Sequence, residues 1–492
     1  MSRPAATVEA GARRPDDAMN AGAAPVRDGL PQPQRAYSMV VILLGIAVAV
    51  LDGTIVNLAL PGIARQLQAS PSAAIWVVNA YQIATLVMLL PLAALGDRVG
   101  YRRVYLVGMV LFTLSSLAAC FSNSLGMLIA ARALQGLGAA GIMSVNAALV
   151  RLTYPSAGLG RGMANNSLTV AAASVAGPSV AAAILSVASW PWLFALNVPL
   201  GVLVLVLGWK ALPHNVAKAQ GMRIAPLDVL LNVLMFSLIF IGADGLGVRD
   251  SGAVHGAPLV AWATLGAGVL VGVFYVGRQR RMPLPLFPVD LLRIPVFALS
   301  MCTSVMAFCA QMLAFIALPF LLLGAYGRSH VEAGLLITAW PLAIVVTAPL
   351  AGRLIGRYPD GLLGGVGMCL MACGLAALAL LPAQAANADI AWRMALCGMG
   401  FGLFQSPNNH TIVSSPPPHR SGAASGMLGT ARLTGQTLGA VLLAVLFSFV
   451  PTQGGKGPMI ALGLAAACAA CAALTSSLRV RAPRPAHLAG RV

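Results

Sequence analysis

The chain has 492 residues, of which 59% are hydrophobic and only 9% are charged. A soluble domain carries roughly 25% charged residues, so this composition argues against a soluble enzyme or binding module. The net charge of +18 does not indicate a nucleic-acid partner, because the basic residues separate apolar runs and are not clustered on a soluble domain.

The beginning of the chain differs from the rest in composition. Residues 1–37 are rich in Ala, Pro, Gly, Arg and Asp and lack an apolar core. Such a segment cannot bury enough apolar surface to fold, so it is predicted to be a disordered cytoplasmic tail. The first apolar run after the tail is of full spanning length, which argues against a cleavable signal peptide.

Apolar runs of about 20 residues recur from Ser38 to Arg479. A helix of about that length crosses the ~30 Å hydrocarbon layer of a bilayer, so the predicted fold class is an all-α polytopic membrane protein. Fourteen runs are predicted to span the membrane, at 38–60, 73–95, 104–122, 126–150, 163–187, 193–212, 227–247, 258–277, 296–323, 332–355, 362–382, 391–412, 422–450 and 457–478.

Lys and Arg are divided unevenly between the two sides of these spans. The two tails and the loops after the even-numbered spans hold 24 of them, the loops on the other side hold four, and three lie in or at the ends of spans. Cytoplasmic loops are enriched in basic residues. Both termini are therefore predicted to be cytoplasmic, which requires an even number of spans.

The first span contains a carboxylate, Asp52, in the otherwise almost wholly apolar stretch VLDGTIVNLALPGI. A carboxylate inside a bilayer is expensive and usually functional. At a rise of ~1.5 Å per residue, Asp52 and Arg132 of the fourth span both lie ~21 Å above the inner surface, so mutual compensation is possible. A purely structural ion pair remains the alternative to a proton-coupling site.

Asp244 is another carboxylate inside a predicted span. It lies ~27 Å along the seventh span, close to the outer surface. We expect it to be hydrated there and less suited to coupling than Asp52.

The segment ALGDRVGYRRVYLVG follows the second span. Asp97 ends one helix, Gly100 permits a tight turn, and Arg102 and Arg103 begin the next helix. This is either an ordinary charged cytoplasmic loop or a salt-bridged latch between helices that separate when a transporter changes conformation.

The same loop resembles the signature between spans 2 and 3 of the major facilitator superfamily, usually G-x-L-a-D-R-x-G-R-K. Ala93 and Tyr101 depart from that pattern. The match rests on Leu95 and on the four residues that the resemblance assigns to a cytoplasmic gating loop, Asp97, Arg98, Gly100 and Arg102.

Further stretches resemble the fourteen-span drug:proton antiporter family of that superfamily. LDGTIVNLALP at 51–61 resembles its first-span signature, and RALQGLGAAG at 132–141 resembles its span-4 motif R-x-x-Q-G-x-G-A-A. WPWLFALNVPLG at 190–201 resembles its W-R-W-x-F-x-x-N-x-P-x-G, with Pro191 in place of Arg. The resemblance covers nearly the whole chain after the tail.

The dipeptide Gly177 and Pro178 resembles the span-5 antiporter motif of that family, G-P-x-x-G-G, although Ala181 and Ala182 replace the last two glycines. Pro178 removes an intrahelical hydrogen bond and can bend the span. Such a bend would serve gating, and simple packing tolerance explains the proline nearly as well.

The span-4 motif also has a physical interpretation. Arg132, Gln135 and Asn146 belong to a stripe with 3–4 spacing on one face of the helix, which we expect to face a cavity or the bundle interior. The literal G-x-G-x-x-G at 136–141 does not follow a strand, so it does not indicate a dinucleotide site. Its small residues instead let helices approach closely in lipid.

Polar side chains in several spans are candidates for lining a central substrate cavity, although each alone is more often structural than ligand-binding. They are Asn57, Gln82, Gln135, Asn146, Gln311, Gln405, Asn408, Asn409 and Arg432. Arg432 has no acid in its own half at matching depth, so it either faces water or pairs with a polar shell around Gln436.

The resemblance implies two six-helix bundles joined by two additional helices. The bundles would comprise 38–212 and 296–479, the additional helices and their loops 213–295, and a C-terminal cytoplasmic tail 480–492. Repeats in this superfamily pack around a midplane cavity and rock in alternating access.

The residues and the resemblance together predict a proton-coupled exporter of small, amphipathic or toxic compounds. Asp52 is the expected proton carrier and Arg132 its partner, because burial favours a protonated carboxyl and a nearby cation favours the ionised one. The sequence has no G-x-x-x-x-G-K-[ST] loop, which argues against direct coupling to ATP. The expected setting is the bacterial cytoplasmic (inner) membrane, with a small-molecule substrate and protons as partners, no cofactor and a monomeric chain.

Two other functional classes remain open. A specific exporter of an amino acid, a sugar or a siderophore uses the same fold. A membrane enzyme or sensor would need a soluble domain or a metal or nucleophile constellation, and the sequence shows neither. The literal CxxC of Cys468 and Cys471 lies among alanines in a span, so we expect packing thiols there and no metal site.

Overall fold

A computed structural model describes residues 29–155, 158–213, 225–246, 257–282, 285–382, 385–416 and 421–480. Within these ranges the chain is helical almost throughout and has no strand, only an isolated bridge between Ile355 and Tyr358. The predicted all-α class is thereby confirmed. Most of the two predicted tails lies outside the described residues, and the first helix begins at Gln34.

Each predicted span corresponds to a helical segment. The long helices are α2 (Gln34–Gln66), α3 (Pro71–Val99), α4 (Tyr101–Cys120), α5 (Leu125–Thr153), α6 (Leu159–Val187), α9 (Pro226–Gly245), α10 (Ala257–Gln279), α11 (Pro295–Pro319), α12 (His330–Leu354), α13 (Asp360–Ala379), α14 (Asn387–Ser414), α15 (Ser421–Phe449) and α16 (Lys456–Leu478). The sixth predicted span is divided into the short α7 (Pro191–Ala195) and α8 (Asn197–Ala211), and a π-helical turn, Phe320–Ala325, continues α11.

Thirteen helical segments in the described ranges are long and apolar enough to cross a membrane. The segment that does not meet this criterion is α14, which has 28 residues but a polar composition. Its charged and strongly polar residues are Asn387, Asp389, Arg393, Gln405, Asn408, Asn409 and His410. Because α14 packs against α12 and α13, it completes the fourteen spans that the sequence predicts.

The helix ends follow local sequence signals. Ser70 caps α3 by accepting a hydrogen bond from Ala73 N at 3.2 Å, and Pro71 takes the first helical position. Ser329 and Glu332 form a capping box at the start of α12. Gly100 has φ 109°, a conformation that glycine tolerates, and it allows the sharp turn from α3 into α4.

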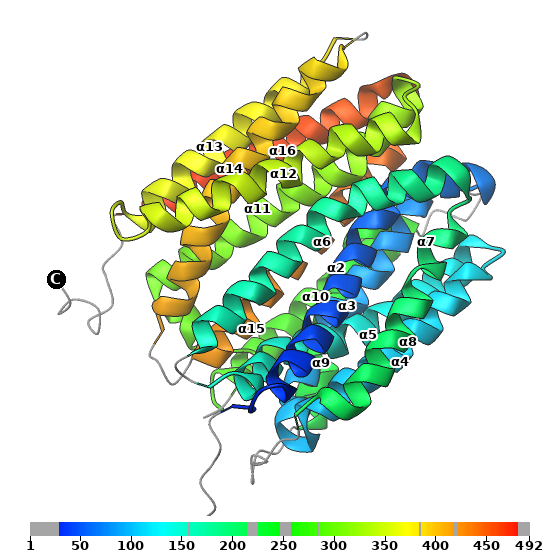
Figure 1. Cartoon of the computed structure of the whole chain (residues 1–492). Helices are drawn as coiled ribbons and strands as arrows, with labels where there is room; N and C mark the ends of the chain where they lie inside the picture. Colours follow the sequence, from blue (N-terminus) through cyan, green and yellow to red (C-terminus); the bar gives the residue numbers. More distant parts are fainter. Residues whose placement is uncertain are drawn as a thin grey trace, which may run out of the picture.

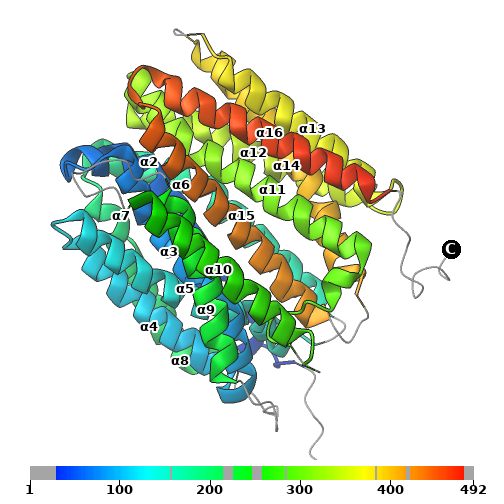
Figure 2. The same cartoon turned by 180° about the vertical axis from the view of Figure 1, so that it is seen from behind.

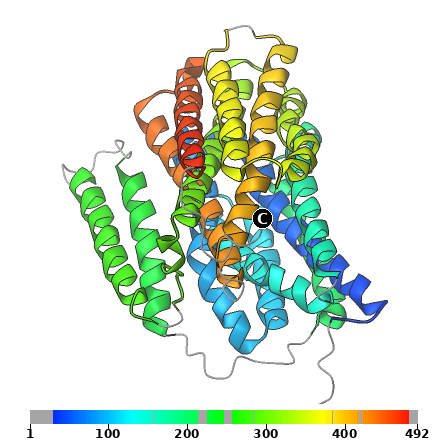
Figure 3. The ribbon, with the colours of Figure 1, turned by 90° about the vertical axis from the view of Figure 1, so that its left-hand side faces the viewer.

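The helices form two groups and a separate pair. We call α2–α8 the N-terminal half and α11–α16 the C-terminal half (Figure 1). Helices α9 and α10 form an antiparallel pair, the central hairpin, which lies at the side of both halves (Figure 3). Helix α9 contacts α3 of the N-terminal half and α15 of the C-terminal half (Figure 2).

Both halves contribute to a large apolar core towards one end of the bundle, which we call the closed end. This core includes Ile55–Ile63 of α2, Ile75–Val78 of α3, Ala307–Leu322 of α11 and its π-helical turn, and Ala333–Trp340 of α12. A second apolar cluster joins α3 and α9 to Leu433 and Val441 of α15. At the opposite end, which carries Gln34 and Leu478, separate apolar clusters belong to the N-terminal and C-terminal halves. The closed end carries the connection between α2 and α3.

The glycine-rich motif of α5 brings three helices together. A Cβ on Gly136 would lie 2.4 Å from Tyr81 O of α3, and a Cβ on Gly138 would lie 2.5 Å from Phe112 N of α4. A side chain at either position would therefore collide with backbone atoms. This close contact of α3, α4 and α5 positions the polar side chains described next.

Candidate functional site

Asp52 lies in α2 with none of its surface exposed. Its Oδ2 accepts a hydrogen bond from Arg132 Nη1 of α5 at 2.6 Å. Its Oδ1 accepts from Gln135 Nε2 at 2.9 Å and from Asn197 Nδ2 at the start of α8 at 2.7 Å. Both carboxylate oxygens therefore have donors, as an ionised carboxylate requires when it is buried.

Arg132 is equally enclosed, with 1% of its surface exposed. Its Nε donates to Val77 O of α3 at 3.1 Å, and its Nη1 also donates to Gln135 Oε1 at 2.6 Å. Its Cζ lies 4.2 Å from the centre of the Tyr81 ring and 5.6 Å from that of Phe194, both within range for a cation–π interaction. Helices α2, α3, α5, α7 and α8 thus meet around one ion pair.

Sequence reasoning missed two members of this network. Asn197 is the asparagine of the motif WPWLFALNVPLG, and that motif could have indicated it as a site residue. Ser116 of α4 has no such signal. Its Oγ accepts from Gln135 Nε2 at 2.7 Å and donates to Phe112 O at 2.8 Å, which extends the network into α4.

A proton on Asp52 removes its charge and turns one oxygen into a donor. That hydrogen would take up one of the directions from which Arg132, Gln135 and Asn197 now donate, so a proton would weaken the hydrogen bonds that Asp52 accepts from these side chains. A single proton can therefore change the contacts among α2, α5 and α8.

Gly177 and Pro178 of α6 lie where the two halves meet. A Cβ on Gly177 would lie 2.1 Å from Thr54 Oγ1 of α2, so the close approach of α6 to α2 at this point requires glycine. On α12, Gly334 packs so closely that a Cβ there would lie 2.9 Å from Pro178 O and 3.6 Å from Leu58 of α2. The G-P motif is therefore part of the contact between the halves near the closed end.

The predicted cavity residues of the N-terminal half occupy different surroundings. Asn57 and Gln82 are buried, and the carbonyl oxygen of each side chain has no hydrogen-bond partner. Asn146 Nδ2 donates to Asn166 Oδ1 of α6 at 2.7 Å. Only Gln135 is in direct contact with Asp52.

The predicted residues of the C-terminal half do not join the Asp52 network in the described part of the chain. Gln311, Gln405 and Asn409 are partly exposed. Arg432 of α15 has its Cζ 5.6 Å from the centre of the Phe308 ring, and its Nε has no hydrogen-bond partner. Arg432 therefore contacts an aromatic ring, which neither expected alternative for this residue included.

Asn408 belongs to a second buried network, around Arg479. Arg479 Nη1 donates to Asn408 Oδ1 at 2.7 Å and to Ser300 Oγ at 2.9 Å, while Asn408 Nδ2 donates to Ser304 Oγ at 2.7 Å. Burial lowers the pKa of the Arg479 guanidinium to about 10, so it remains charged at neutral pH. This network ties α11, α14 and the end of α16 together.

The predicted gating loop has contacts within and between helices. Asp97 Oδ1 accepts from Tyr101 OH at 2.5 Å, and Arg102 Nη2 donates to Trp209 O at the end of α8. Tyr101 is one of the two residues that depart from the superfamily signature, and its hydroxyl donates to Asp97, the carboxylate of that signature. Arg98 lies in the last turn of α3.

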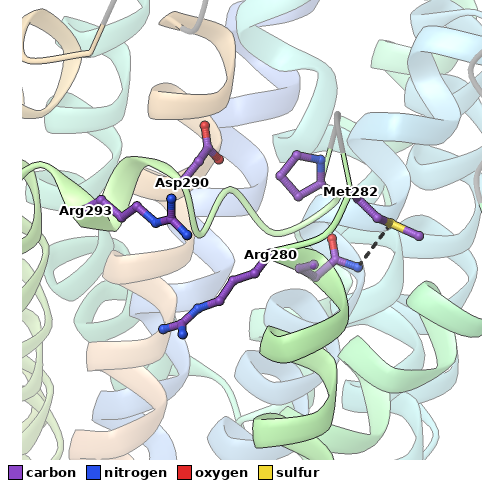
Figure 4. A pocket seen from close by; sticks show the side chains of 6 residues that line it. Arg280, Met282, Asp290 and Arg293 are labelled. Atoms are coloured by element: carbon purple, nitrogen blue, oxygen red, sulfur yellow. Dashed lines mark hydrogen bonds between the residues drawn. The ribbon is translucent and has the colours of Figure 1, made fainter.

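A small pocket lies apart from these networks, between α10 and α11 (Figure 4). Its lining residues are Gln279, Arg280, Met282, Pro285, Asp290 and Arg293. None of the predicted site residues lines it. Among the described residues, no group of three or more His, Cys, Asp or Glu side chains could hold a metal ion.

Comparison with known proteins places this geometry in a family. The sequence profile of the Major Facilitator Superfamily matches residues 42–440. The chain is 53% identical over 457 residues to the "Uncharacterized transporter YebQ" of Escherichia coli (strain K12), covering 93% of this chain and 98% of that protein. It is 30% identical to the "Tetracenomycin C resistance and export protein" of Streptomyces glaucescens, covering 85% of this chain and 76% of that protein.

A solved structure has a similar fold. It is that of a bacterial homologue of the human lysosomal transporter Spinster, described as inward-facing and unoccupied. The TM-score is 0.64 at 14% sequence identity, with 92% of this chain and 98% of that chain covered.

Proposed function

Because the chain belongs to the Major Facilitator Superfamily, we propose that this transporter is a proton-coupled exporter of small amphipathic or toxic compounds. The observation that carries the proposal is the buried pair of Asp52 and Arg132 at 2.6 Å. An ionisable group inside a membrane is costly and usually marks a proton or substrate pathway.

The orientation proposed from the Lys and Arg distribution puts both termini in the cytoplasm of a bacterial inner membrane. The closed end then faces outward, and α2, α3, α11 and α12 share their apolar core there. Alternating access would require the shared core at the closed end to separate while the cytoplasmic ends approach.

The position of Asp52 on α2 gives a route for coupling. Two residues farther along α2, Thr54 packs against Gly177, and one turn beyond it Leu58 lies close to Gly334 of the other half. A proton on Asp52 would change the bonds that hold α2 to α5 and α8. It would thereby shift the balance between conformations that differ in the contact of α2 with α6 and α12.

We expect an imposed pH gradient to drive transport without nucleotide. A host that expresses the protein would first be screened against chemically diverse toxic compounds, and a compound to which it becomes resistant would be used with proteoliposomes. Transport should stop when a protonophore collapses the gradient. Transport that persists after the collapse, and that requires ATP or sodium, would contradict the proposal. Resistance to one compound class only would favour a specific solute exporter.

We propose that Asp97 controls the rate of conformational exchange more than substrate binding, because it lies at the helix end outside the hydrocarbon layer. Asp97→Asn removes the charge and should slow transport about tenfold or more, which corresponds to ~1.4 kcal/mol on the barrier. Equilibrium binding of the same compound should stay within a few-fold of wild type.

Tyr101→Phe is the matched control for Asp97→Asn, because it removes the hydrogen bond and keeps the charge. A large loss of affinity in Asp97→Asn with normal turnover would show that this loop is not a latch.

A further inference from the structure

Asp244 is a buried carboxyl group that the proposed coupling mechanism does not use. It lies at the end of α9 near the closed end and is 6% exposed, so the expectation that it is hydrated is wrong. Its Oδ2 accepts a hydrogen bond from Trp76 Nε1 of α3 at 2.7 Å. Its Oδ1 is buried and has no hydrogen-bond partner.

The contrast with Asp52 is clear in the described part of the chain. The ion pairs found there join Asp52, Asp228, Asp389 and Asp360 to basic side chains, and none includes Asp244. Asp52 has donors on both oxygens, whereas Asp244 has one donor on one oxygen. An ionised Asp244 would have only one hydrogen bond and no paired cation to offset the free-energy cost of burying its charge.

The helices packed around Asp244 carry their charged side chains elsewhere. Asp228 and Arg278 pair at 2.7 Å at the opposite end of the hairpin, and Asp228 is about 24 Å from Asp244 along α9 at the helical rise. The remaining charged and titratable side chains of α3, α10 and α15 in the described ranges are Tyr81, Asp97, Arg98, Tyr275 and Arg432. Arg432 contacts Phe308 of α11.

We propose that Asp244 is a second proton-binding site, neutral in this structure, that fastens the central hairpin to the N-terminal half. A protonated carboxyl keeps an acceptor for Trp76 and carries no charge, so its burial costs far less than that of a carboxylate. Trp76 is the positioning residue for Asp244. The indole N–H of Trp76 donates to Oδ2 and so fixes which carboxyl oxygen of Asp244 remains an acceptor. This inference goes beyond the proposed function and does not depend on it.

The two helices of the central hairpin pack closely enough to move as one rigid unit. A Cβ on Gly242 would lie 2.5 Å from Leu265 N, and a Cβ on Gly268 would lie 2.7 Å from Ile239 N, so α9 and α10 pack backbone to backbone. The ion pair of Asp228 with Arg278 adds a polar tie at the other end.

The two sides of the hairpin differ in how they bind their neighbours. Two side-chain hydrogen bonds join α9 to α3, one from Trp76 to Asp244 and one from Asn232 Nδ2 to Val87 O at 2.8 Å. The contact with α15 is formed by an apolar cluster that includes Leu433 and Val441. The hairpin therefore travels with α3 and slides along α15, and loss of the proton from Asp244 releases the closed end of α9 from α3.

The test uses the full chain in nanodiscs, without substrate or gradient. Infrared difference spectra recorded on raising the pH should show loss of a protonated carboxyl C=O band. Asp244→Asn should lack this band, and Asp52→Asn should keep it. Asp228→Asn is the matched control on the same helix and should also keep it. A folded Asp244→Asn protein that retains the full band overturns the proposal.

A second measurement keeps Asp244 in place. Trp76→Phe should shift the frequency of the band by removing its hydrogen bond, and an unshifted band would overturn the proposed contact. Hydrogen exchange at the closed end of α9 should rise with pH in the wild type beyond the intrinsic dependence of amide exchange, and should not do so in Asp244→Asn. Equal pH dependence in both proteins would show that the carboxyl does not fasten the hairpin.

Discussion

Asp52→Asn is expected to reduce gradient-driven export to the background of empty vesicles while leaving a folded protein in the membrane. The amide keeps the shape of the carboxyl and can still accept through Oδ1, but it cannot take up or release a proton. Arg132 loses its anion in this variant but keeps its hydrogen bonds to Val77 O and Gln135 Oε1 and its contact with the Tyr81 ring, so we expect the protein to fold. Uptake into proteoliposomes and the pH dependence of binding measure the effect.

Asp389→Asn is the matched control for this variant. Asp389 pairs with Arg393 one turn away on α14, and its side chain is 33% exposed, so its loss should change transport little. If Asp52→Asn still concentrates the compound against a gradient with the pH dependence of the wild type, Asp52 has a structural role.

Arg132→Met is expected to destabilise the folded protein by about 3–5 kcal/mol, because it leaves Asp52 buried without its cation. The double variant with Asp52→Asn should recover most of that loss, because no uncompensated charge then remains. The thermal unfolding midpoint of detergent-solubilised protein measures both effects.

Two outcomes would contradict this account of Arg132. Wild-type stability of Arg132→Met would show that the ion pair is not needed in the buried network. A double variant as unstable as Arg132→Met would assign the loss to the contacts of Arg132 with Val77 and Tyr81, and not to the charge.

The helices could be predicted from the sequence because each one is a long apolar run between charged or turn-forming residues. The hydrophobic period and the helical rise also gave the depth of Asp52 and Arg132. They could not identify Ser116 or Arg479 as partners, because depth and face do not determine which distant helix lies opposite. Contacts such as Gly136 with Tyr81 decide that choice, and they depend on how backbones fit together.

The surroundings of Asp244 could not be predicted from the sequence either. Its position near the end of a span suggested contact with water, since rise along the helix was the only information available. The structure covers it with α3, through the indole of Trp76. A tryptophan at a helix end is common at a membrane interface, so its presence in the sequence did not reveal this bond.

The polar composition of α14 has a consequence for how the protein is made. A helix that carries Gln405, Asn408 and Asn409 in its interior enters lipid poorly by itself, because polar side chains are costly to bury among acyl chains. Its packing neighbours α12 and α13 both precede it in the chain. They are therefore already synthesised when α14 emerges from the ribosome, and α14 can leave the insertion channel against protein surfaces instead of acyl chains.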